Sequence, residues 1–513
     1  MKLLLILFTF IIGASAQAQF SKTYSLHKSV NIGTPITMIE TSDNGFVFAA
    51  DRNNDELHFV KLDSDGEISW AKILEGRYIS AYHGIIESAN GDYFLSATVI
   101  DSSYLDLNRK HRVYKLSGEG ELYWAKDIQR SADFTNSARI EEIDGHIFVI
   151  GFYLDESHSY CMSITKMDLD GELSWQKSYK DSTNNLFPSS SLVTPTGELI
   201  IAGKINKHGF ICKLNNSGDV LWYKFLEEGF YFKINEIKLS ANNEILMVGT
   251  SRESNSCFVT YHVFAARFTL DGNQVWGNHY ANSDFSEFGY SINETIDDGL
   301  IITASQREYT NSNTWYSQLI KTNASGLIEW SSYLRPDDFS LPLSSVTNAE
   351  GELTILGING ISTNDEDSQY MLTRTSNSFE TTCAQSDASY WSEPFETGDF
   401  LSLSVEDFMQ INDISQNIRE TTITSTYLCS TLSTDNSIIK NTSNQANVYP
   451  NPTLGRINFI NSPLKVVITD LSGRVIVKYK TCNSIDISDL PNGMYLIVQE
   501  FENHTLVDRL LKE

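Results

Sequence analysis

The sequence predicts an all-β protein: a seven-bladed β-propeller, a small β extension and a C-terminal β-sandwich. Two observations predict the propeller. A turn motif ending in Trp occurs six times, and a short β-rich run ending in Ala or Gly occurs seven times. A third observation, a change of residue pattern after Asn447, predicts the separate sandwich. No stretch of comparable length has helical periodicity, which favours an all-β class.

The N-terminus has the pattern of a cleavable secretory signal. One Lys precedes an apolar run from Leu3 to Ile12, and the small residues Ala14 and Ala16 follow. The apolar run is about ten residues, too short to span a bilayer, and no later stretch is long enough. We expect residues 1–16 to be the signal peptide, with cleavage after residue 16 or 18. The mature chain should then lie outside the cytoplasm and have no transmembrane segment.

The repeated motif has a basic residue, a Gly five positions later and a Trp nine positions later. It accounts for six of the eight Trp. Successive Trp are 47 to 54 residues apart, which suits a four-stranded propeller blade. The copies are Lys61, Gly66, Trp70; Lys115, Gly120, Trp124; Lys166, Gly171, Trp175; Lys213, Gly218, Trp222; Arg267, Gly272, Trp276; and Lys321, Gly326, Trp330.

The second repeated element is a turn signal followed by four or five apolar or β-branched residues. Such runs, bounded by N-G and D-G signals, are typical of strands joined by tight turns. Seven copies predict seven blades within residues 19–380. The runs end at Ala50, Ala97, Gly151, Gly203, Gly249, Ala304 and Gly357.

The seventh unit lacks its outer strand, because Cys383 occupies the position expected for Trp, nine residues after Arg374. The segment "FSKTY" at residues 20–24 matches "WQKSY" at residues 175–179 in its aromatic, Lys and Tyr positions. We therefore expect the N-terminal strand to complete the last blade. Such closure removes two exposed sheet edges.

The repeated motif forms the turn between strands c and d of each blade, if the strands are lettered a to d from the centre outward. Its Gly supplies the positive φ of a tight turn, and its Asp side chains cap the turn. The acidic residues Asp63, Asp65 and Glu67 also resemble the start of a calcium loop. However, four of the six copies lack the acidic pair, so the pattern favours turn chemistry. The sequence predicts no metal and no cofactor.

The formal net charge of −27 argues against nucleic-acid binding, which needs a basic surface. An acid-rich surface that maintains solubility is the simpler interpretation, and recognition of a cationic partner is the alternative.

Residues 381–446 are rich in Ser and Thr and contain alternating stretches such as "FLSLSVEDF". They predict a small β extension, with an irregular stalk or linker as the alternative. Of the six cysteines, Cys383 and Cys429 bracket this segment and are the candidate disulfide.

Residues 447–513 predict four or more strands separated by P-N-P, S-G-R and P-N-G turns. This region resembles the type A C-terminal sorting domain of cargo for the type IX (Por) secretion system. The resemblance implies delivery through the periplasm by the type IX machinery, followed by release or attachment at the outer membrane. The sorting-motif residues that carry the resemblance are Tyr449, Pro450, Asn451, Pro452, Gly473, Arg474, Gly493 and Tyr495.

The sequence favours an exported binding or adhesion protein, with a polysaccharide or protein ligand, over an enzyme. The repeat resembles that of quinoprotein dehydrogenases, but the chain has no adjacent Cys pair and seven predicted blades rather than eight. No G-x-S-x-G or H-E-x-x-H motif occurs, and the ten His are scattered. A hydrolase or lyase, with carboxylates contributed by different blades, is the alternative.

The predicted binding face is the one formed by the b–c and d–a loops. The span from the last residue of the β-rich run to the motif's basic residue varies from 10 to 18 residues, whereas the c–d turn keeps one length. Variable loops commonly carry binding residues. The d–a connections supply aromatic rings that line a stacking platform, or that merely cover the blade ends. The candidates are Tyr82, Phe134, Phe187, Tyr231 and Tyr290.

Overall fold

The computed structural model places most of the predicted strands. It describes residues 20–27, 37–52, 56–75, 77–78, 84–100, 109–128, 135–155, 157–180, 185–226, 230–253, 260–281, 285–308, 315–334, 340–359, 369–380, seven short strands between residues 385 and 429, and residues 448–449, 456–459, 465–469, 475–480, 484–488, 490–500 and 505–512. Residues 1–431 and 432–513 form two compact units. The predicted signal peptide lies outside the described residues.

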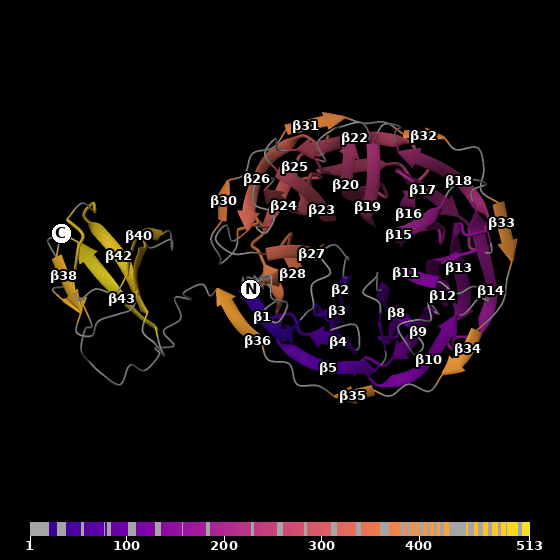
Figure 1. The fold of residues 1–513 in the computed structure, drawn as a ribbon, viewed down its shortest axis with the longest axis horizontal. Coiled ribbons are helices and arrows are strands. Elements are labelled where there is room, and N and C mark those ends of the chain that lie inside the picture. Colours follow the sequence, from indigo (N-terminus) through magenta and orange to yellow (C-terminus); the bar gives the residue numbers. More distant parts are fainter. Residues whose placement is uncertain are drawn as a thin grey trace, which may run out of the picture. The chain divides into compact units, whose positions relative to one another are not determined.

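The first unit is a seven-bladed propeller, as the sequence predicts (Figure 1). Each blade is an antiparallel sheet with four strands, a to d, and the last blade takes its fourth strand from the N-terminus. In chain order the blades are β2 (Met38–Glu40), β3 (Phe46–Arg52), β4 (Glu56–Leu62), β5 (Ile68–Glu75); β7 (Gly84–Glu87), β8 (Tyr93–Ile100), β9 (Arg109–Leu116), β10 (Leu122–Ile128); β11 (Thr135–Ile143), β12 (His146–Leu154), β13 (Tyr160–Asp168), β14 (Leu173–Lys180); β15 (Leu186–Val193), β16 (Leu199–Ile205), β17 (His208–Leu214), β18 (Val220–Leu226); β19 (Phe230–Leu239), β20 (Ile245–Glu253), β21 (His262–Phe268), β22 (Gln274–Ala281); β23 (Phe285–Glu294), β24 (Leu300–Glu308), β25 (Trp315–Thr322), β26 (Ile328–Leu334); and β27 (Ser340–Thr347), β28 (Leu353–Asn359), β29 (Gln369–Arg374), β1 (Phe20–His27).

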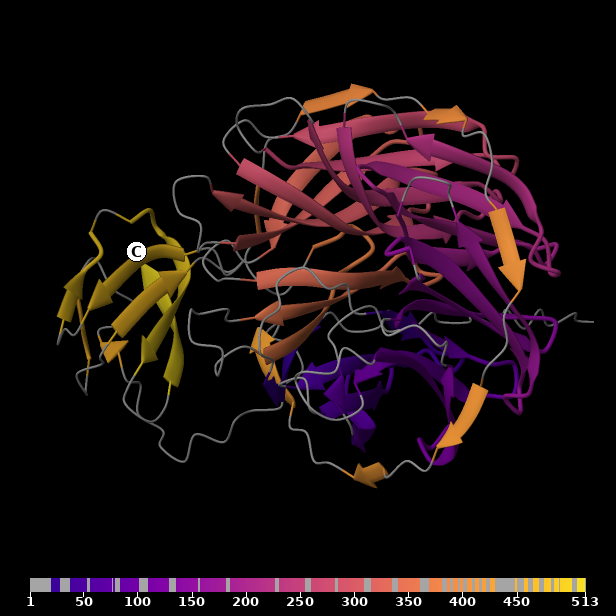
Figure 2. The ribbon, with the colours of Figure 1, turned by 45° about the vertical axis from the view of Figure 1, so that its right-hand side comes forward.

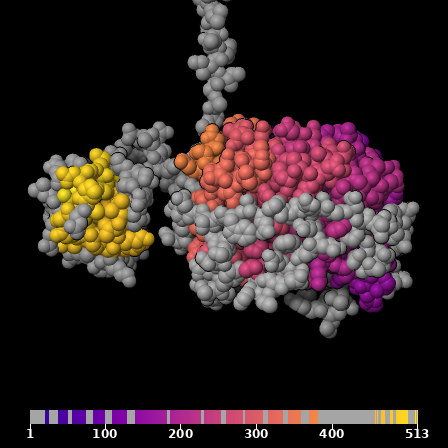
Figure 3. Space-filling model, turned by 90° about the horizontal axis from the view of Figure 1, so that it is seen from above, coloured from indigo at the N-terminus to yellow at the C-terminus, as the bar shows by residue number. Residues whose placement is uncertain are grey.

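Apolar side chains fill the space between neighbouring blades. Ile200 of β16 and Met247 of β20, for example, belong to one buried cluster although they come from blades 4 and 5. Seen from the side, the blades that face the viewer follow one another in chain order (Figure 3). Each blade is therefore stabilised by its neighbours, and an open ring would expose two apolar faces to water.

The N-terminal strand closes this ring, which confirms the prediction. In β1, Phe20 pairs with Arg374 and Tyr24 with Tyr370 of β29. The side chains of Phe20 and Tyr24 are both buried. Strand d of the last blade thus comes from the opposite end of the propeller sequence.

A belt of seven short strands, defined here as β30 to β36, surrounds the propeller (Figures 1 and 2). Each strand pairs antiparallel with strand d of one blade, in the order of blades 6, 5, 4, 3, 2, 1 and 7. The belt therefore runs around the ring against the order of the blades and gives every blade a fifth strand. Edge strands attract unwanted pairing, so this covering protects all seven outer edges. The strands are β30 (Gln385–Asp387), β31 (Trp391–Pro394), β32 (Thr397–Asp399), β33 (Ser404–Asp407), β34 (Ile411–Ile414), β35 (Ile418–Glu420) and β36 (Ser425–Cys429).

The predicted disulfide stays a prediction. The backbone of Cys429 pairs with Ser21 at the end of the belt, and Cys383 lies outside the described residues. Cys161 and Cys212 are buried free thiols.

The second unit is a small sandwich of a three-stranded and a four-stranded sheet. Ile457 and Ile485 of one sheet share a buried core with Val466, Ile497 and Leu510 of the other. This arrangement agrees with the predicted sandwich. Its strands are β37 (Val448–Tyr449), β38 (Arg456–Phe459), β39 (Lys465–Thr469), β40 (Val475–Lys480), β41 (Ser484–Asp486), β42 (Gly493–Glu500) and β43 (Thr505–Lys512).

Candidate functional site

The repeated c–d turns use their acidic side chains as caps, as the sequence predicts. The Asp63 Oδ1 atom accepts hydrogen bonds from the backbone N–H groups of Asp65, at 2.9 Å, and Glu67, at 2.8 Å. Asp168 caps its own turn in the same way. Gly66 has a φ of 73°, a conformation that suits Gly. The carboxylates that resemble a calcium loop therefore accept backbone hydrogen bonds within the turn.

The repeated basic residue has a role that the sequence did not indicate. The Lys61 Nζ atom lies 2.6 Å from Asp43 Oδ1, and the Lys321 Nζ atom lies 2.9 Å from Asp297 Oδ2. Both lysines are buried, and both carboxylates belong to the a–b turn of the same blade. Each pair therefore connects strand c to the a–b turn.

The repeated Trp connects one blade to the next. The Trp70 Nε1 atom donates to the carbonyl oxygen of Gly118, and Trp222 Nε1 donates to that of Leu270, in the following c–d turn. A Cβ atom added at Gly272 would lie 3.0 Å from the Trp222 ring. The turn face of the propeller, formed by the a–b and c–d turns, is thus a seam that holds the blades together.

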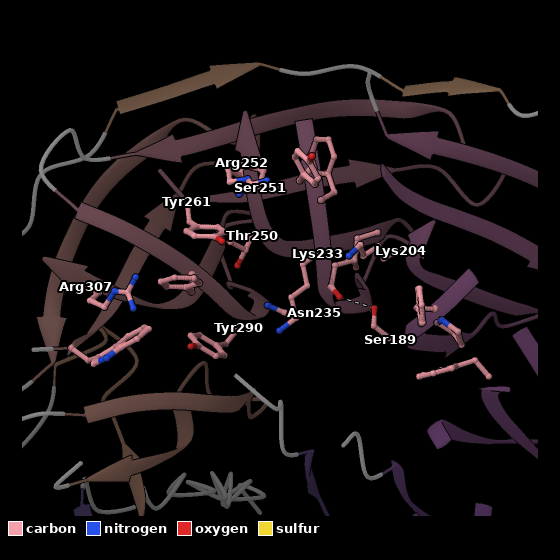
Figure 4. A pocket seen from close by; sticks show the side chains of 18 residues that line it. Ser189, Lys204, Lys233, Asn235, Thr250, Ser251, Arg252, Tyr261, Tyr290 and Arg307 are labelled. Atoms are coloured by element: carbon pink, nitrogen blue, oxygen red, sulfur yellow. Dashed lines mark hydrogen bonds between the residues drawn. The ribbon is translucent and has the colours of Figure 1, made fainter. Parts of the chain in front are cut away.

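The opposite face, formed by the b–c and d–a loops, contains a pocket of about 790 Å³ (Figure 4). Its residues lie in the first part of strand a, at the end of strand b and at the start of strand c, in blades 3 to 6. Eight of the described lining residues are aromatic, four are Lys or Arg, and none is Asp or Glu. They are Phe152, Phe187, Pro188, Ser189, Lys204, Tyr231, Phe232, Lys233, Ile234, Asn235, Thr250, Ser251, Arg252, Tyr261, Phe288, Tyr290, Arg307 and Trp315.

A ladder of rings and guanidinium groups crosses the pocket from blade 5 to blade 6. The Arg252 guanidinium lies 4.2 Å from the centre of the Tyr231 ring and 5.9 Å from that of Tyr261. The ring centres of Tyr261 and Phe288 are 5.2 Å apart, as are those of Phe288 and Trp315. The ladder ends at the Arg307 guanidinium, 5.2 Å from the Trp315 ring. These contacts hold the rings in place before any ligand arrives.

Lys204 and Lys233 supply further positive charge, on the side of the pocket away from Arg307 (Figure 4). Lys233 is accessible to solvent, yet it lies within the hollow, where surrounding protein displaces part of its hydration. This desolvation lowers the pKa of Lys233, and repulsion from the Lys204 ammonium lowers the pKa further. The two ammonium groups therefore destabilise one another.

Two polar side chains at the bottom of the pocket have unused hydrogen-bonding capacity. Asn235 and Thr250 are both at least nine-tenths buried. The Asn235 Nδ2 atom donates to the carbonyl oxygen of Gly289. Its Oδ1 atom, and the Thr250 Oγ1 atom, have no hydrogen-bond partner among the described residues. Buried polar atoms normally have partners, so these two atoms suit a polar ligand.

The structure brings three of the five predicted binding residues, Phe187, Tyr231 and Tyr290, into this one pocket. They lie within strand a (β15, β19 and β23), and not in the d–a connections as predicted. Tyr82 and Phe134 lie outside the described residues. Sequence reasoning missed the cations, although a signal was present: Lys204, Arg252 and Arg307 each follow the terminal Ala or Gly of a β-rich run within three positions.

The predicted sorting-motif residues lie in the second unit where they are described. Tyr449 is in β37, and Gly493 and Tyr495 are in β42. The buried Tyr495 hydroxyl donates to the carbonyl oxygen of Pro491 at 2.7 Å, so the ring supports the turn before β42. Pro450, Asn451, Pro452, Gly473 and Arg474 lie outside the described residues.

Solved structures that are similar to the chain include PorZ, Uly1 and Arb93A. PorZ, a bacterial surface component of the type IX secretion system of Porphyromonas gingivalis, is 9% identical with a TM-score of 0.32 over 92% of this chain and 69% of its own. The polysaccharide lyase Uly1 is 9% identical with a TM-score of 0.42, over 70% and 98%. The α-L-arabinofuranosidase Arb93A of Fusarium graminearum is 10% identical with a TM-score of 0.38, over 70% and 99%. All three TM-scores are below 0.5, so the propeller assignment rests on the sheet topology.

The search of curated proteins found no significant match to this chain. Among the described residues, no helix has the length and apolar character needed to cross a membrane. Residues 447–513 match the family described as the secretion system C-terminal sorting domain. The propeller is therefore joined to a type IX sorting domain, which marks the protein for export to the cell surface or for secretion.

Proposed function

We propose that the protein is an exported propeller that binds a glycan in the pocket on its loop face. The observation that carries this proposal is the ladder of rings and guanidinium groups from Tyr231 to Arg307. Sugars present apolar ring faces that pack on aromatic side chains, and a concave aromatic site with a few convergent polar groups suits such a ligand. The unpartnered oxygens of Asn235 and Thr250 would hydrogen-bond sugar hydroxyl groups.

The contrast between the faces supports this location. On the turn face the acidic side chains cap turns or pair with lysines, so those polar groups already have structural roles. In the pocket, side chains from blades 3 to 6 converge on a hollow large enough for a short oligosaccharide.

An enzyme acting at the same site is the second candidate. The described lining residues include no carboxylate pair of the kind that glycoside hydrolases use. The partly exposed Tyr231 instead lies beside Arg252, and the hydrogen bond with Lys207, together with the Lys207 and Arg252 charges, lowers the pKa of Tyr231. A lowered pKa makes the phenolate, the form that accepts a proton, more accessible at neutral pH. This arrangement favours elimination over carboxylate-assisted hydrolysis.

A glycan panel, read by calorimetry on the purified mature protein, tests the proposed function. Tyr231→Ala and Tyr261→Ala should each weaken binding about five- to ten-fold, as expected for loss of one stacking surface worth about 1 to 1.4 kcal/mol. Asp170→Ala, on the turn face, is the matched control and should leave affinity unchanged. Loss of binding in Asp170→Ala alone would contradict the proposal. Ultraviolet absorbance of the same mixtures would detect the carbon–carbon double bond that a lyase creates.

A further inference from the structure

The charge of the pocket is opposite to that of the whole chain. The chain has a formal net charge of −27, yet four of the described pocket residues are Lys or Arg and none is acidic. A concave site lined by one sign of charge concentrates ligands of the opposite sign. An acidic protein surface alone would not produce such a site.

The cations are also arranged differently from those of the turn face. Lys61, Lys72 and Lys321 each lie within 3.0 Å of a carboxylate oxygen. Some turn-face cations also lie over a ring, as Lys126 does over Trp124, but Lys126 pairs with Glu172 as well. In the pocket, Arg252 and Arg307 make cation–π contacts and form no ion pair with a carboxylate among the described residues. A guanidinium stacked on a ring still has N–H groups at its edge that can donate two hydrogen bonds to a carboxylate or sulfate group.

The repulsion between Lys204 and Lys233 points the same way. Desolvation in the hollow lowers the pKa of Lys233 most, and the nearby Lys204 ammonium lowers it further, because like charges repel one another. An anion bound between them would remove this repulsion and would gain two charge-assisted hydrogen bonds.

From this geometry we infer that the pocket binds an acidic glycan, whose ionised carboxylate or sulfate groups contact Lys204, Lys233, Arg252 and Arg307 while its sugar rings stack on the ladder. This inference rests on the proposed function and names its ligand class. These four cations come from blades 4 to 6. Several acidic sugars of one glycan chain would therefore be bound together. Carboxylate and sulfate share the required charge, and the experiment distinguishes them.

The test measures affinity for polygalacturonate, alginate, hyaluronan and a sulfated galactan, with methyl-esterified polygalacturonate and unsulfated galactan as neutral partners. Full-length mature protein is titrated with short chains of each at low and at raised ionic strength. We expect at least one acidic glycan to bind ten-fold or more tightly than its neutral partner, and its affinity to fall as salt rises. Binding of the carboxylated or of the sulfated ligand identifies the acidic group.

Variants then test the assigned residues. Arg252→Gln and Lys233→Gln should each weaken the acidic ligand about ten-fold, which corresponds to one charge-assisted contact of about 1.4 kcal/mol. Arg252→Lys, which keeps the charge, should restore part of the loss. Lys177→Gln removes one positive charge from the turn face, where Lys177 pairs with Asp219, and should have no effect. Thermal unfolding of every variant verifies that the fold is intact.

The outcomes separate the two proposals. Equal affinity for acidic and neutral partners, still sensitive to Tyr231→Ala, would overturn the acidic ligand and leave the glycan site in place. Acidic binding that survives both Arg252→Gln and Lys233→Gln would overturn the assignment of the cations. Failure of every acidic glycan in the panel would overturn the inference, and failure of the neutral glycans as well would overturn the proposed function.

Discussion

The two faces of the propeller use the same residue types for different purposes. On the turn face, Lys61 pairs with Asp43 within one blade, and Lys72 pairs with Glu121 of the next. On the loop face, Arg252 and Arg307 lie against Tyr231 and Trp315 in an open pocket. A cation beside a carboxylate stabilises the ring, whereas a cation held over an aromatic ring in a pocket is available to a ligand. Turn-face cations such as Lys126 also lie over a ring, but Lys126 pairs with Glu172 as well. An ion pair with a carboxylate, rather than a nearby ring, therefore distinguishes these seam cations from those of the pocket.

Substitution of a seam tryptophan should have the largest effect. Trp222→Ala removes a ring that packs on Gly272 of the next blade and donates to the carbonyl oxygen of Leu270. We expect the free energy of unfolding to fall by about 2 to 4 kcal/mol. This is somewhat less than the loss for a fully buried aromatic residue, because the Trp222 ring is only partly buried. Chemical denaturation measures the change. Leu221→Ala, at the exposed neighbouring position, should cost little, and equal costs would refute the seam.

Loss of a turn cap should have an intermediate effect. Asp168→Ala removes the acceptor for the backbone N–H groups of Asp170 and Glu172. We expect a loss of about 1 kcal/mol in the free energy of unfolding, which is typical of a lost capping interaction. Adding calcium should change the melting temperature of the original protein and of the variant by the same amount. A calcium-dependent melting temperature that disappears in Asp168→Ala would show that the turn is a metal site.

The pairing of the motif's basic residue with the a–b turn should give a small effect that depends on pH. A hydrogen bond from Thr295, together with the Lys321 ammonium, lowers the pKa of Asp297 to about 2. Because the folded-state pKa lies below the ordinary value of 3.8, the ionised carboxylate stabilises the fold above about pH 4, and this contribution is lost as the pH falls towards 2.

Asp297→Asn should therefore cost a few tenths of a kcal/mol at neutral pH, since the carboxylate is largely exposed and Lys321 retains Glu329 at 2.9 Å. Denaturation curves of the two proteins at several pH values would show the difference shrinking towards pH 2. A difference that stays constant with pH would mean that the charge of Asp297 does not contribute.

The repeats made the architecture predictable, because each motif is a local rule. A Gly at positive φ, a capping Asp, Asn, Ser or Thr, and a Trp at constant spacing describe one turn, and the six copies describe six of the seven blades. The match of Phe20–Tyr24 to Trp175–Tyr179 was sufficient to predict closure by β1. The aromatic residues Phe187, Tyr231 and Tyr290 occupy different register positions of strand a, so no local spacing indicated that they would share one pocket.

By itself the sequence determined the strand class, the number of blades, their closure and the C-terminal sorting domain, since each depends on patterns within a few tens of residues. Only the tertiary structure decided the belt, whose strands of three to five residues pair with partners up to about 400 positions away, as Cys429 does with Ser21. It also decided which cations lie beside carboxylates and which lie beside rings. Those pairings depend on distances between blades, and no local spacing in the chain encodes them.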